Sequence, residues 1–540
     1  MSRPKSAQAL QSAIAHHQAG RLPEAIAIYR EIVAAERNNP DATHLLALAL
    51  HQSGDDAQAI PLFNRALMLS PTIPAYAANF AELWRKQGNW PSAVECYRKV
   101  LRLEPGNQQI RQLLGEALNK LEKFAEAESE FKVVAGAKPG NANTWVGLAE
   151  ALRRGGKLDE SIDAARRGIA ADPNNADALH ALGWGFIRQG KPAEGVAFID
   201  QAIRVRPAVA KLRWHRAWGR LLMGDYGRGW ADYEARWDDP ELQQRFRRPF
   251  AQPQWRGESA AGKTTLIHAE QGLGDTIQFV RYAPLLAERG AKVIVEAQPE
   301  LAALLRRSMP AMEVIAAGQP LPPFDFHVPM LSLPLAFGTT LQTIPNNVPY
   351  LTADEPATLA WRQTLADLPG LKVGLVWAGR PTHRNDVNRS VRLDRLAPLA
   401  QIPGVSFVSL QLGEASQQIK VPPAGMKLFD ASSGMTDFDS TAGLVSALDL
   451  VIAVDTAIVH LCGAMGRPIW ALIQHDPDFR WMLGCEDTPW YPTVRLFRQP
   501  TFGDWDAVAR RVAEELGHVG LAHRTTVDPA APLIRKSMSD

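Results

Sequence analysis

Residues 449–470 read DLVIAVDTAIVHLCGAMGRPIW, and this stretch decides how the second half of the chain folds. The apolar, β-branched run from Leu450 to Val454 predicts a buried parallel strand, and the apolar residues after Asp455 and Thr456 recur at helical spacing. In such a strand, turn and helix unit, the free N–H groups and the positive dipole end of the helix point to the ligand side of the sheet. The stretch therefore indicates either an anion site, such as a phosphate site, or a plain helix cap.

Composition limits the class of protein. With 540 residues, 46% of them hydrophobic, the chain is long enough for several domains. It carries 59 Lys and Arg against 57 Asp and Glu, which gives no overall basis for binding nucleic acid or a membrane surface. The three cysteines form no CxxC pair, so we expect neither a disulfide framework nor a structural zinc site. The N-terminus has no apolar signal core and no apolar run reaches the length of a membrane span, which predicts a soluble, cytoplasmic protein.

A repeat of 34 residues runs through residues 1–240. Turn glycines, small residues, aromatic residues and prolines recur in four phases, and Glu122 fills the one slot that lacks its glycine. The phases are Gly20, Gly54, Gly88, Gly156, Gly190 and Gly224; Ala25, Ala59, Ala93, Ala127, Ser161, Gly195 and Gly229; Tyr29, Phe63, Tyr97, Phe131 and Tyr233; and Pro71, Pro105, Pro139, Pro173 and Pro207. The pattern resembles the tetratricopeptide repeat, with about seven units. Such an array forms a superhelix whose concave groove binds a protein or peptide, the alternative being a spacer or oligomerisation arm.

A first α/β segment occupies residues 241–360. After a basic connector it predicts a strand from Thr264 to Ala269, then the turn EQGLGDT, then a helix. The glycines of this turn, Gly272 and Gly274, allow close approach of a ligand, but the third glycine of a dinucleotide fingerprint is absent.

Asp275 is the residue of interest in that turn, because ligands of α/β sheets bind at the carboxyl ends of the strands. As a general base, Asp275 would take a proton from an acceptor hydroxyl. As a helix cap, it would accept a backbone N–H. Glu270 and Gln271 in the same turn would orient Asp275 or contact a substrate.

A second α/β segment occupies residues 361–520. Its predicted strand from Lys372 to Gly379 leads into the basic loop RPTHRNDVNRSVRL, a candidate clamp for the pyrophosphate of a nucleotide or a solvated charged loop. Glu414, at the end of a further strand predicted from Val405, would hold ribose hydroxyls or be exposed. Trp481 belongs to an aromatic stretch that would wall a cleft or lie in the core. The D-x-D pairs, Asp437 with Asp439 and Asp476 with Asp478, are weak signals for a divalent cation.

Four motifs spread in order over about residues 250 to 515 resemble one family. They are HAEQGLGDTIQFVRY, GLVWAGRPTHRNDVNRSVRL, DLVIAVDTAIVHLCGAMGRPIW and FRWMLGCEDTPWYPTVRLFRQP. They look like the catalytic half of bacterial tetratricopeptide-repeat glycosyltransferases, which is similar to the heptosyltransferase family and, more distantly, to O-linked N-acetylglucosamine transferase. The resemblance implies a GT-B fold of two facing Rossmann-like domains, with residues 241–360 on the acceptor side and residues 361–520 on the nucleotide-sugar side. It also implies an inverting transfer that uses a nucleotide sugar as co-substrate and needs neither a metal nor a cofactor.

The resemblance assigns roles to individual residues. Asp275 matches the general base, and Arg389 falls near the basic residue that touches the donor phosphates. The D-T-x-x-x-H motif, which binds the donor sugar and diphosphate, falls on Asp455, Thr456, Ala457 and His460. Two departures are Ala457 in place of a frequent glycine, and arginine where heptosyltransferases often carry lysine. The acceptor side or cleft would contain Glu270, Gln271, Gly274 and Trp481, and Glu414 would join the donor site.

These observations together predict a glycosyltransferase that modifies a hydroxyl group, on a protein Ser or Thr selected by the repeats. One alternative is a repeat scaffold whose α/β half has lost activity and binds a nucleotide or a partner. Another is a heptosyltransferase-like enzyme that acts on a surface saccharide. Residues 521–540 are expected to form a disordered tail.

Overall fold

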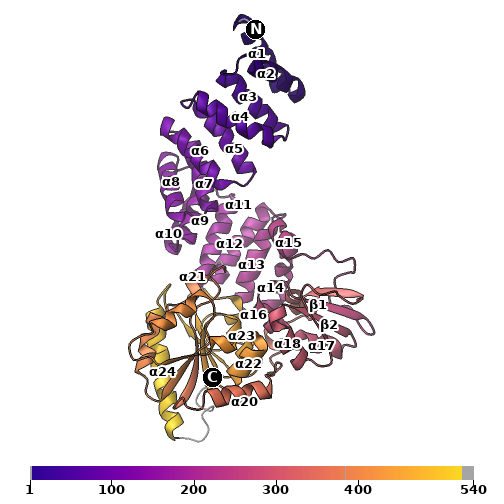
Figure 1. Ribbon diagram of the computed structural model, residues 1–540, viewed down its shortest axis with the longest axis vertical. Helices are drawn as coiled ribbons and strands as arrows, with labels where there is room; N and C mark the ends of the chain where they lie inside the picture. Colours follow the sequence, from indigo (N-terminus) through magenta and orange to yellow (C-terminus); the bar gives the residue numbers. More distant parts are fainter. Residues whose placement is uncertain (1–2, 384, 526–540) are drawn as a thin grey trace. The chain divides into compact units, whose positions relative to one another are not determined.

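The protein is described by a computed structural model that covers residues 3–383 and 385–525 (Figure 1). The chain divides into two compact units. The first consists of Met1–Phe186 with Ala197–Arg206, and the second of Ile187–Val196 with Pro207–Asp540.

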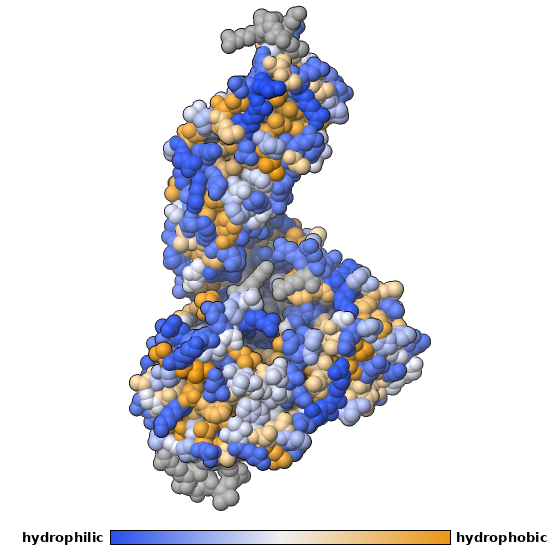
Figure 2. Space-filling model, in the orientation of Figure 1, coloured by the Kyte–Doolittle hydropathy of each residue, from blue (hydrophilic) through white to orange (hydrophobic). Residues whose placement is uncertain are grey.

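The first unit is built from helical hairpins that stack one after another (Figure 1). The helices are α1 (Arg3–Gln18), α2 (Leu22–Ala35), α3 (Pro40–Gln52), α4 (Asp56–Leu69), α5 (Pro74–Lys86), α6 (Trp90–Leu103), α7 (Gln108–Lys120), α8 (Phe124–Ala137), α9 (Ala142–Arg154) and α10 (Leu158–Ala171), followed by most of α11 (Ala176–Arg188) and α12 (Pro192–Val205). Several of these helices begin at a residue whose side chain caps the helix. The side chains of Asn39 and Asn107, for example, each accept a backbone N–H of the first helical turn. Hydrophilic and apolar residues alternate over the face of these helices shown in Figure 2.

The predicted repeat phases are confirmed along the helical part of the chain, up to α14 in the second unit. The turn glycines, from Gly20 to Gly224, have φ between 71° and 88°, a region that suits glycine. Glu122 takes the same left-handed conformation with φ of 60°. The small residues and aromatic residues of the other phases are buried where the helices of a hairpin meet, for example Ala25 and Phe63 at 0% exposure.

The last helical pair of the predicted array belongs to the second unit. Helices α13 (Ala210–Leu222) and α14 (Tyr226–Tyr233) continue into η1 (Glu234–Trp237) and α15 (Pro240–Phe246). Their aromatic face packs on the α/β part: Trp230 meets Phe479 at 5.5 Å between ring centroids, and the Tyr226 hydroxyl accepts the indole N–H of Trp490 at 3.0 Å. Helices α13 and α14 thus belong to the same compact unit as the two sheets, and their aromatic side chains are buried by distant parts of the chain.

A smaller parallel sheet follows, with the strand order β3-β2-β1-β4. Its strands are β1 (Thr264–His268), β2 (Lys292–Ala297), β3 (Glu313–Ala316) and β4 (Phe326–Pro329). The helical segments around it are α16 (Leu273–Phe279), α17 (Tyr282–Glu288), α18 (Pro299–Ser308), η2 (Met330–Ser332), α19 (Leu333–Ala336) and η3 (Leu341–Thr343). In the register, Leu266 pairs with Ile294 on one side and His327 on the other.

A larger parallel sheet has the order β10-β9-β8-β5-β6-β7. Its strands are β5 (Leu371–Val376), β6 (Val405–Ser409), β7 (Leu428–Asp430), β8 (Leu450–Val454), β9 (Ile469–Ile473) and β10 (Val494–Arg498). Its helical segments are α20 (Glu355–Thr364), α21 (Asp386–Arg389), η4 (Leu393–Gln401), η5 (Glu414–Lys420), η6 (Ser432–Gly434), α22 (Phe438–Ser446), α23 (Ala457–Ala464), η7 (Phe479–Trp481) and α24 (Trp505–Thr525). Every residue of β8 and β9 is buried, as expected for continuous apolar runs in a parallel sheet.

The predicted strand Leu450–Val454 and the helix after it are confirmed. The strands predicted from Lys372 and Val405 end earlier than expected, at Val376 and Ser409. Beyond Val376, the N–H groups of Trp377 and Ala378 donate to the side chain of Gln411 and not to a neighbouring strand. Helix α24 continues to Thr525, so the first residues of the predicted tail are helical, and residues 526–540 lie outside the described part. None of the helices between Arg3 and Thr525 is long and apolar enough to cross a membrane.

Candidate functional site

Two helices that follow strands of different sheets meet at their N-terminal turns. Helix α16 comes after β1, and α23 comes after β8. A Cβ atom at Gly274 would lie 2.7 Å from Cδ2 of His460 and 3.6 Å from Cα of Ala457. Gly274 therefore permits a backbone approach that a side chain would block, and three of the predicted site residues, Gly274, Ala457 and His460, are brought together.

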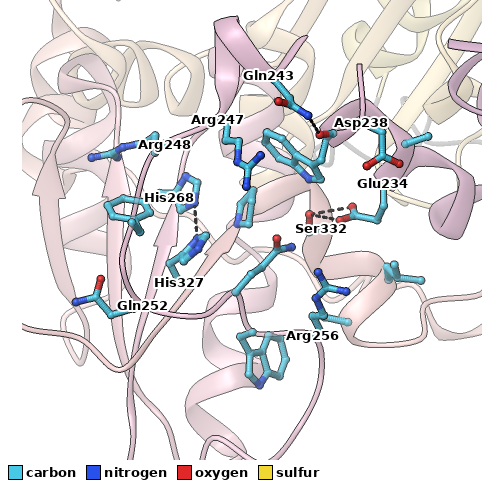
Figure 3. A pocket seen from close by; sticks show the side chains of 18 of the residues that line it. Glu234, Asp238, Gln243, Arg247, Arg248, Gln252, Arg256, His268, His327 and Ser332 are labelled. Carbon is cyan, nitrogen blue, oxygen red and sulfur yellow. Dashed lines mark hydrogen bonds between the residues drawn. The ribbon is translucent and has the colours of Figure 1, made fainter. Parts of the chain in front are cut away.

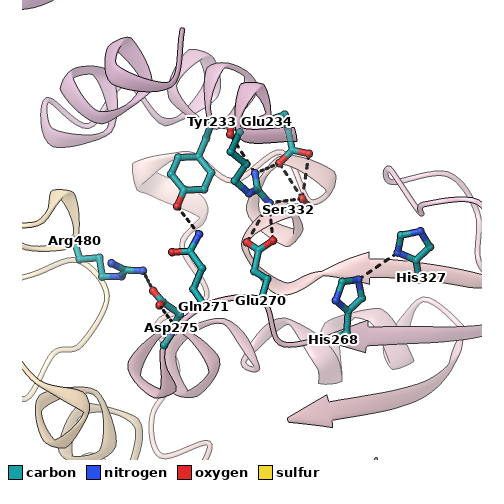
Figure 4. Close-up of polar contacts among 11 residues, drawn as sticks. Tyr233, Glu234, His268, Glu270, Gln271, Asp275, His327, Ser332 and Arg480 are labelled. Carbon is teal, nitrogen blue, oxygen red and sulfur yellow. Dashed lines mark hydrogen bonds and ion pairs between the residues drawn. The ribbon is translucent and has the colours of Figure 1, made fainter. Parts of the chain in front are cut away.

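Asp275 lies at the third position of α16 and makes two contacts (Figure 4). Its Oδ2 accepts the N–H of Gly272 at 2.8 Å, and its Oδ1 forms an ion pair with Arg480. Burial raises the pKa of Asp275 above its usual range, while the Arg480 charge and the Gly272 N–H act in the opposite direction. The capping role considered from the sequence is thus present, and it is combined with an ion pair that reaches from the other sheet.

Arg480, in η7 after β9, was not identified from the sequence. Its side chain is 9% exposed, and it contacts Asp275, Asp478 at 2.9 Å and the side-chain oxygen of Gln278. Burial alone would lower the pKa of Arg480, but the carboxylates of Asp478 and Asp275 outweigh burial and raise it, so the guanidinium stays charged. The feature of the sequence that could have indicated Arg480 is its place beyond the carboxyl end of a buried strand, where ligands of α/β sheets bind.

The start of α23 has no side-chain cap. Thr456 occupies the N-cap position, yet its hydroxyl makes no capping bond, and Oγ1 is buried without a partner in the described part of the chain. The helix therefore keeps its first N–H groups free of side-chain acceptors, which differs from the capping alternative. Burial raises the pKa of Asp455 to about 6, the nearby charge of Asp478 adds to the rise, and the charges of Arg389 and Arg480 oppose it.

Arg389 reaches this helix start from the basic loop. Its Nη1 donates to the backbone oxygen of Asp455 at 3.1 Å, and its Nε donates to Asp386 at 3.0 Å. The structure thus places Arg389 beside the predicted D-T-x-x-x-H segment. The Arg389 side chain is only 15% exposed, as expected for a guanidinium that packs against the turn after β8.

His460 is buried at 6% exposure and held by aromatic side chains. Its Nδ1 lies 3.0 Å from the Tyr491 hydroxyl, and its ring stacks on Trp481 at 5.5 Å between centroids. Burial, assisted by the charge of Arg480, lowers its pKa well below the usual value, so the imidazole is neutral at pH 7. Trp481 itself has 0% exposure, so it lies in the packed core and not along an open cleft, as do the neighbouring Trp490 and Tyr491.

Glu270 and Gln271 turn towards the last helices before the sheet (Figure 4). The Glu270 side chain has 0% exposure and pairs with Arg236 at 3.2 Å. Burial raises the pKa of Glu270 to about 7, against the effect of the Arg236 charge. Gln271 Nε2 donates to the Tyr233 hydroxyl at 3.2 Å. Both residues therefore fasten α14 and η1 to the turn that carries Asp275, and their contacts are internal to the protein.

The remaining predicted residues lie apart from this arrangement. Glu414 is exposed at the start of η5, beyond β6. In the D-x-D pairs, Asp437 caps α22, Asp439 pairs with Arg307 at 2.7 Å, and Asp478 pairs with Arg480. Within residues 3–383 and 385–525 no three His, Cys, Asp or Glu side chains are grouped to hold a metal ion.

Comparison with known proteins identifies the repeats. Models described as "Tetratricopeptide repeat" match residues 16–83, 119–184 and 80–142. Protein FlbA of Caulobacter vibrioides is 30% identical over 319 residues, which is 55% of this chain and 53% of FlbA. The chain thus spans about half the length of that curated relative.

Two solved structures of repeat proteins are similar to part of the chain. YrrB, titled a TPR protein with an unusual peptide-binding site, is 18% identical over 33% of this chain and 92% of its own, with a TM-score of 0.30. A tetratricopeptide repeat protein from Parabacteroides merdae is 18% identical over 42% of this chain and 91% of its own, with a TM-score of 0.37. The chain therefore contains a tetratricopeptide repeat array, a module class that mediates protein interactions, followed by an α/β region with two parallel sheets.

Proposed function

We propose that the chain is an inverting, metal-independent glycosyltransferase that moves a sugar from a nucleotide sugar to a hydroxyl acceptor. The acceptor is a Ser or Thr of a protein that the repeats select, and the two sheets are the two halves of a GT-B fold. One observation carries the proposal: the N-terminal turns of α16 and α23, from different sheets, meet at the contact of Gly274 with His460. This contact brings Asp275 of one half towards the polar groups at the start of α23 in the other.

The α23 side suits a nucleotide diphosphate. Free N–H groups at a helix start and the positive end of its dipole attract phosphate oxygens. A guanidinium has five N–H donors, and Arg389 uses two in the protein contacts described above, so others remain for phosphate. Such preorganised donors stabilise the negative charge that develops on the departing diphosphate.

The α16 side supplies the base. The acceptor oxygen would form a bond to the anomeric carbon while the bond from that carbon to the diphosphate oxygen breaks. The hydroxyl proton would pass to the carboxylate of Asp275, whose pKa is raised by burial towards the range in which a general base works well. Each carboxylate oxygen has two lone-pair sites, so the contacts with Gly272 and Arg480 leave capacity to accept the proton.

The repeats support a protein acceptor. A tetratricopeptide array presents a concave surface of a kind that binds extended or helical peptides. Its fusion to the α/β region would hold a polypeptide substrate at high local concentration near Asp275.

A second function, a scaffold whose α/β region binds without catalysis, is favoured by the occupied carboxylate of Asp275. Both of its oxygens already contact the protein, one with Arg480 and one with Gly272, as in a structural ion pair. In that case the repeats alone would define the protein's activity as a binding platform.

Thermal unfolding in the presence of UDP, GDP, ADP or CMP separates these functions. A ligand that binds only the folded state at about 100 times its Kd stabilises by roughly 2.7 kcal/mol. For an enzyme, we expect one nucleotide to raise the Tm and Arg389→Ala to abolish this rise. The control variant Arg395→Ala, which removes an exposed pair with Asp506, should retain the rise. The absence of a shift with all four nucleotides would favour the scaffold.

A further inference from the structure

A polar cavity lies in the α/β region, beside the carboxyl ends of β1 and β4 (Figure 3). Its volume is about 680 Å³, within the range of roughly 300–1,000 Å³ that small-molecule sites occupy. It is lined by η1, α15, the connector between α15 and β1, and the strand ends that carry His268 and His327. In Figure 4 Glu270 lies between Asp275 and these histidines, and the residues that line the cavity include neither Asp275 nor any residue of α23.

The acidic side chains of the cavity are already neutralised. Asp238 pairs with Arg213 at 2.7 Å, and Glu234 pairs with Arg236 at 2.6 Å. Arg248, which also lines the cavity, pairs with Glu296. Both acidic side chains of the lining, Glu234 and Asp238, therefore have an arginine partner, and Arg236 is shared with Glu270.

Two further arginines of the lining have no such partner. Arg247 enters from one side of the cavity and Arg256 from another (Figure 3). Among the residues that the structure describes, neither side chain forms an ion pair, and both are exposed to solvent. The cavity therefore has a surplus of two guanidinium groups, each with a forked set of donors that matches carboxylate or phosphate oxygens.

The inner wall is polar and uncharged. His268 is 2% exposed, its Nε2 lies 3.3 Å from Nδ1 of His327, and its own Nδ1 is buried with no partner in the described chain. Burial, with smaller effects of His327 and Arg248, lowers the pKa of His268 to about 3, and burial also lowers that of His327. Both rings are neutral at pH 7, so recognition of an anion rests on the two arginines.

We infer that this cavity is a binding site for a small organic anion, a carboxylate or phosphate ester, held by Arg247 and Arg256. The volume exceeds that of a bare ion, and the amides of Gln243, Gln252 and Gln254 line the same space. These amides offer donors and acceptors for the uncharged polar groups of such a ligand. The site is independent of the glycosyl transfer proposed above.

Calorimetric titration of the full chain tests the site, with citrate and glucose 6-phosphate as anionic probes and glucose as the neutral control. We expect at least one anionic probe to bind and glucose not to bind. We also expect Arg247→Gln and Arg256→Gln each to weaken binding by at least about tenfold, because each removes a charge-assisted contact. Both arginines are exposed, so the variants should fold, and circular dichroism verifies this.

Two variants elsewhere identify the site of binding. Arg395→Gln removes an exposed arginine far from the lining and should leave the Kd unchanged. Arg389→Ala removes the proposed diphosphate contact and should also leave it unchanged. Failure of both anions to bind at about 10 mM would overturn the inference. So would binding that survives the double variant Arg247→Gln with Arg256→Gln, or that is lost only in Arg389→Ala.

Discussion

Arg480 and Asp275 form an ion pair across 205 positions of sequence, and it links the segment after β9 to helix α16 beside the smaller sheet. Replacing Arg480 by alanine leaves the carboxylates of Asp275 and Asp478 without their cation. Breaking a buried pair in this way destabilises a protein by about 3–5 kcal/mol. Urea unfolding measures the change.

The matched control is Arg395→Ala, which removes an exposed pair with Asp506 at 3.4 Å. Exposed pairs contribute only about 0–1 kcal/mol, since water screens them and the side chains lose freedom. Equal, small losses in Arg480→Ala and Arg395→Ala would show that the Asp275 pair is not a buried link between the two sheets.

Gly274→Ala tests the contact between α16 and α23. The new Cβ would lie 2.7 Å from the ring of His460, which is itself fixed by Tyr491 and Trp481. Overpacking of this kind costs about 1–3 kcal/mol. The control Gly136→Ala, in a helix with no atom within 4 Å of the new Cβ, should be neutral or stabilising. Similar stability of the two variants would contradict the close approach.

Asp455→Asn tests the partly buried carboxylate at the start of α23. Burial raises the folded-state pKa to about 6 from 3.8, so the folded protein binds a proton more tightly than the unfolded chain. The resulting stability is fully present below about pH 4 and is lost as the pH rises through about 6. The asparagine does not titrate, so the variant does not lose stability in this way. The free energy of unfolding of the variant minus that of the wild type should increase by about 1.4 kcal/mol between pH 5 and pH 7.

Urea unfolding at the two pH values measures this difference. The control Asp367→Asn replaces an exposed carboxylate and should show a constant difference from the wild type. A constant difference for Asp455→Asn as well would mean that Asp455 is solvated and does not carry the raised pKa.

Glu122→Gly should stabilise the repeat array. Glu122 holds φ of 60° in a slot where the other repeats carry glycine, and this conformation costs a non-glycine residue about 1–2 kcal/mol. The exposed ion pair with Arg154 that the change removes contributes less. We therefore expect a net gain of roughly 1 kcal/mol in thermal unfolding, with the converse change Gly88→Ala destabilising. A less stable Glu122→Gly variant would show that the Arg154 pair outweighs the strain.

The sequence predicted features that depend on local pattern. The repeat phases follow from a periodic spacing, and the strand Leu450–Val454 follows from an apolar run that a parallel sheet buries. The family resemblance assigned Arg389 and Asp455 to one donor site, and the two residues lie in contact at 3.1 Å across 66 positions of sequence. The strand signal lies within the strand itself, and the repeat signal lies in a constant spacing of 34 residues.

Features that depend on distant partners were missed or assigned differently. Arg480 gains its role from a residue 205 positions away, and its place after β9 does not reveal that partner. Glu270 was expected to orient Asp275 or to contact a substrate, and it is buried against Arg236 of the segment that precedes the sheet. Trp481 was expected to wall a cleft or to lie in the core, and it is enclosed in the core with His460.

The most direct test of the central proposal is the rate at which Asp275→Asn releases nucleotide from the nucleotide sugar whose base the thermal screen identifies. We expect a rate about 10²–10⁴ times lower than that of the wild type, with nucleotide affinity retained, because the variant lacks the carboxylate that takes the proton but keeps every group proposed to hold the diphosphate. Circular dichroism and the nucleotide-induced rise in Tm verify that the variant is folded and binds. A folded Asp275→Asn variant that turns over at the wild-type rate would contradict the account.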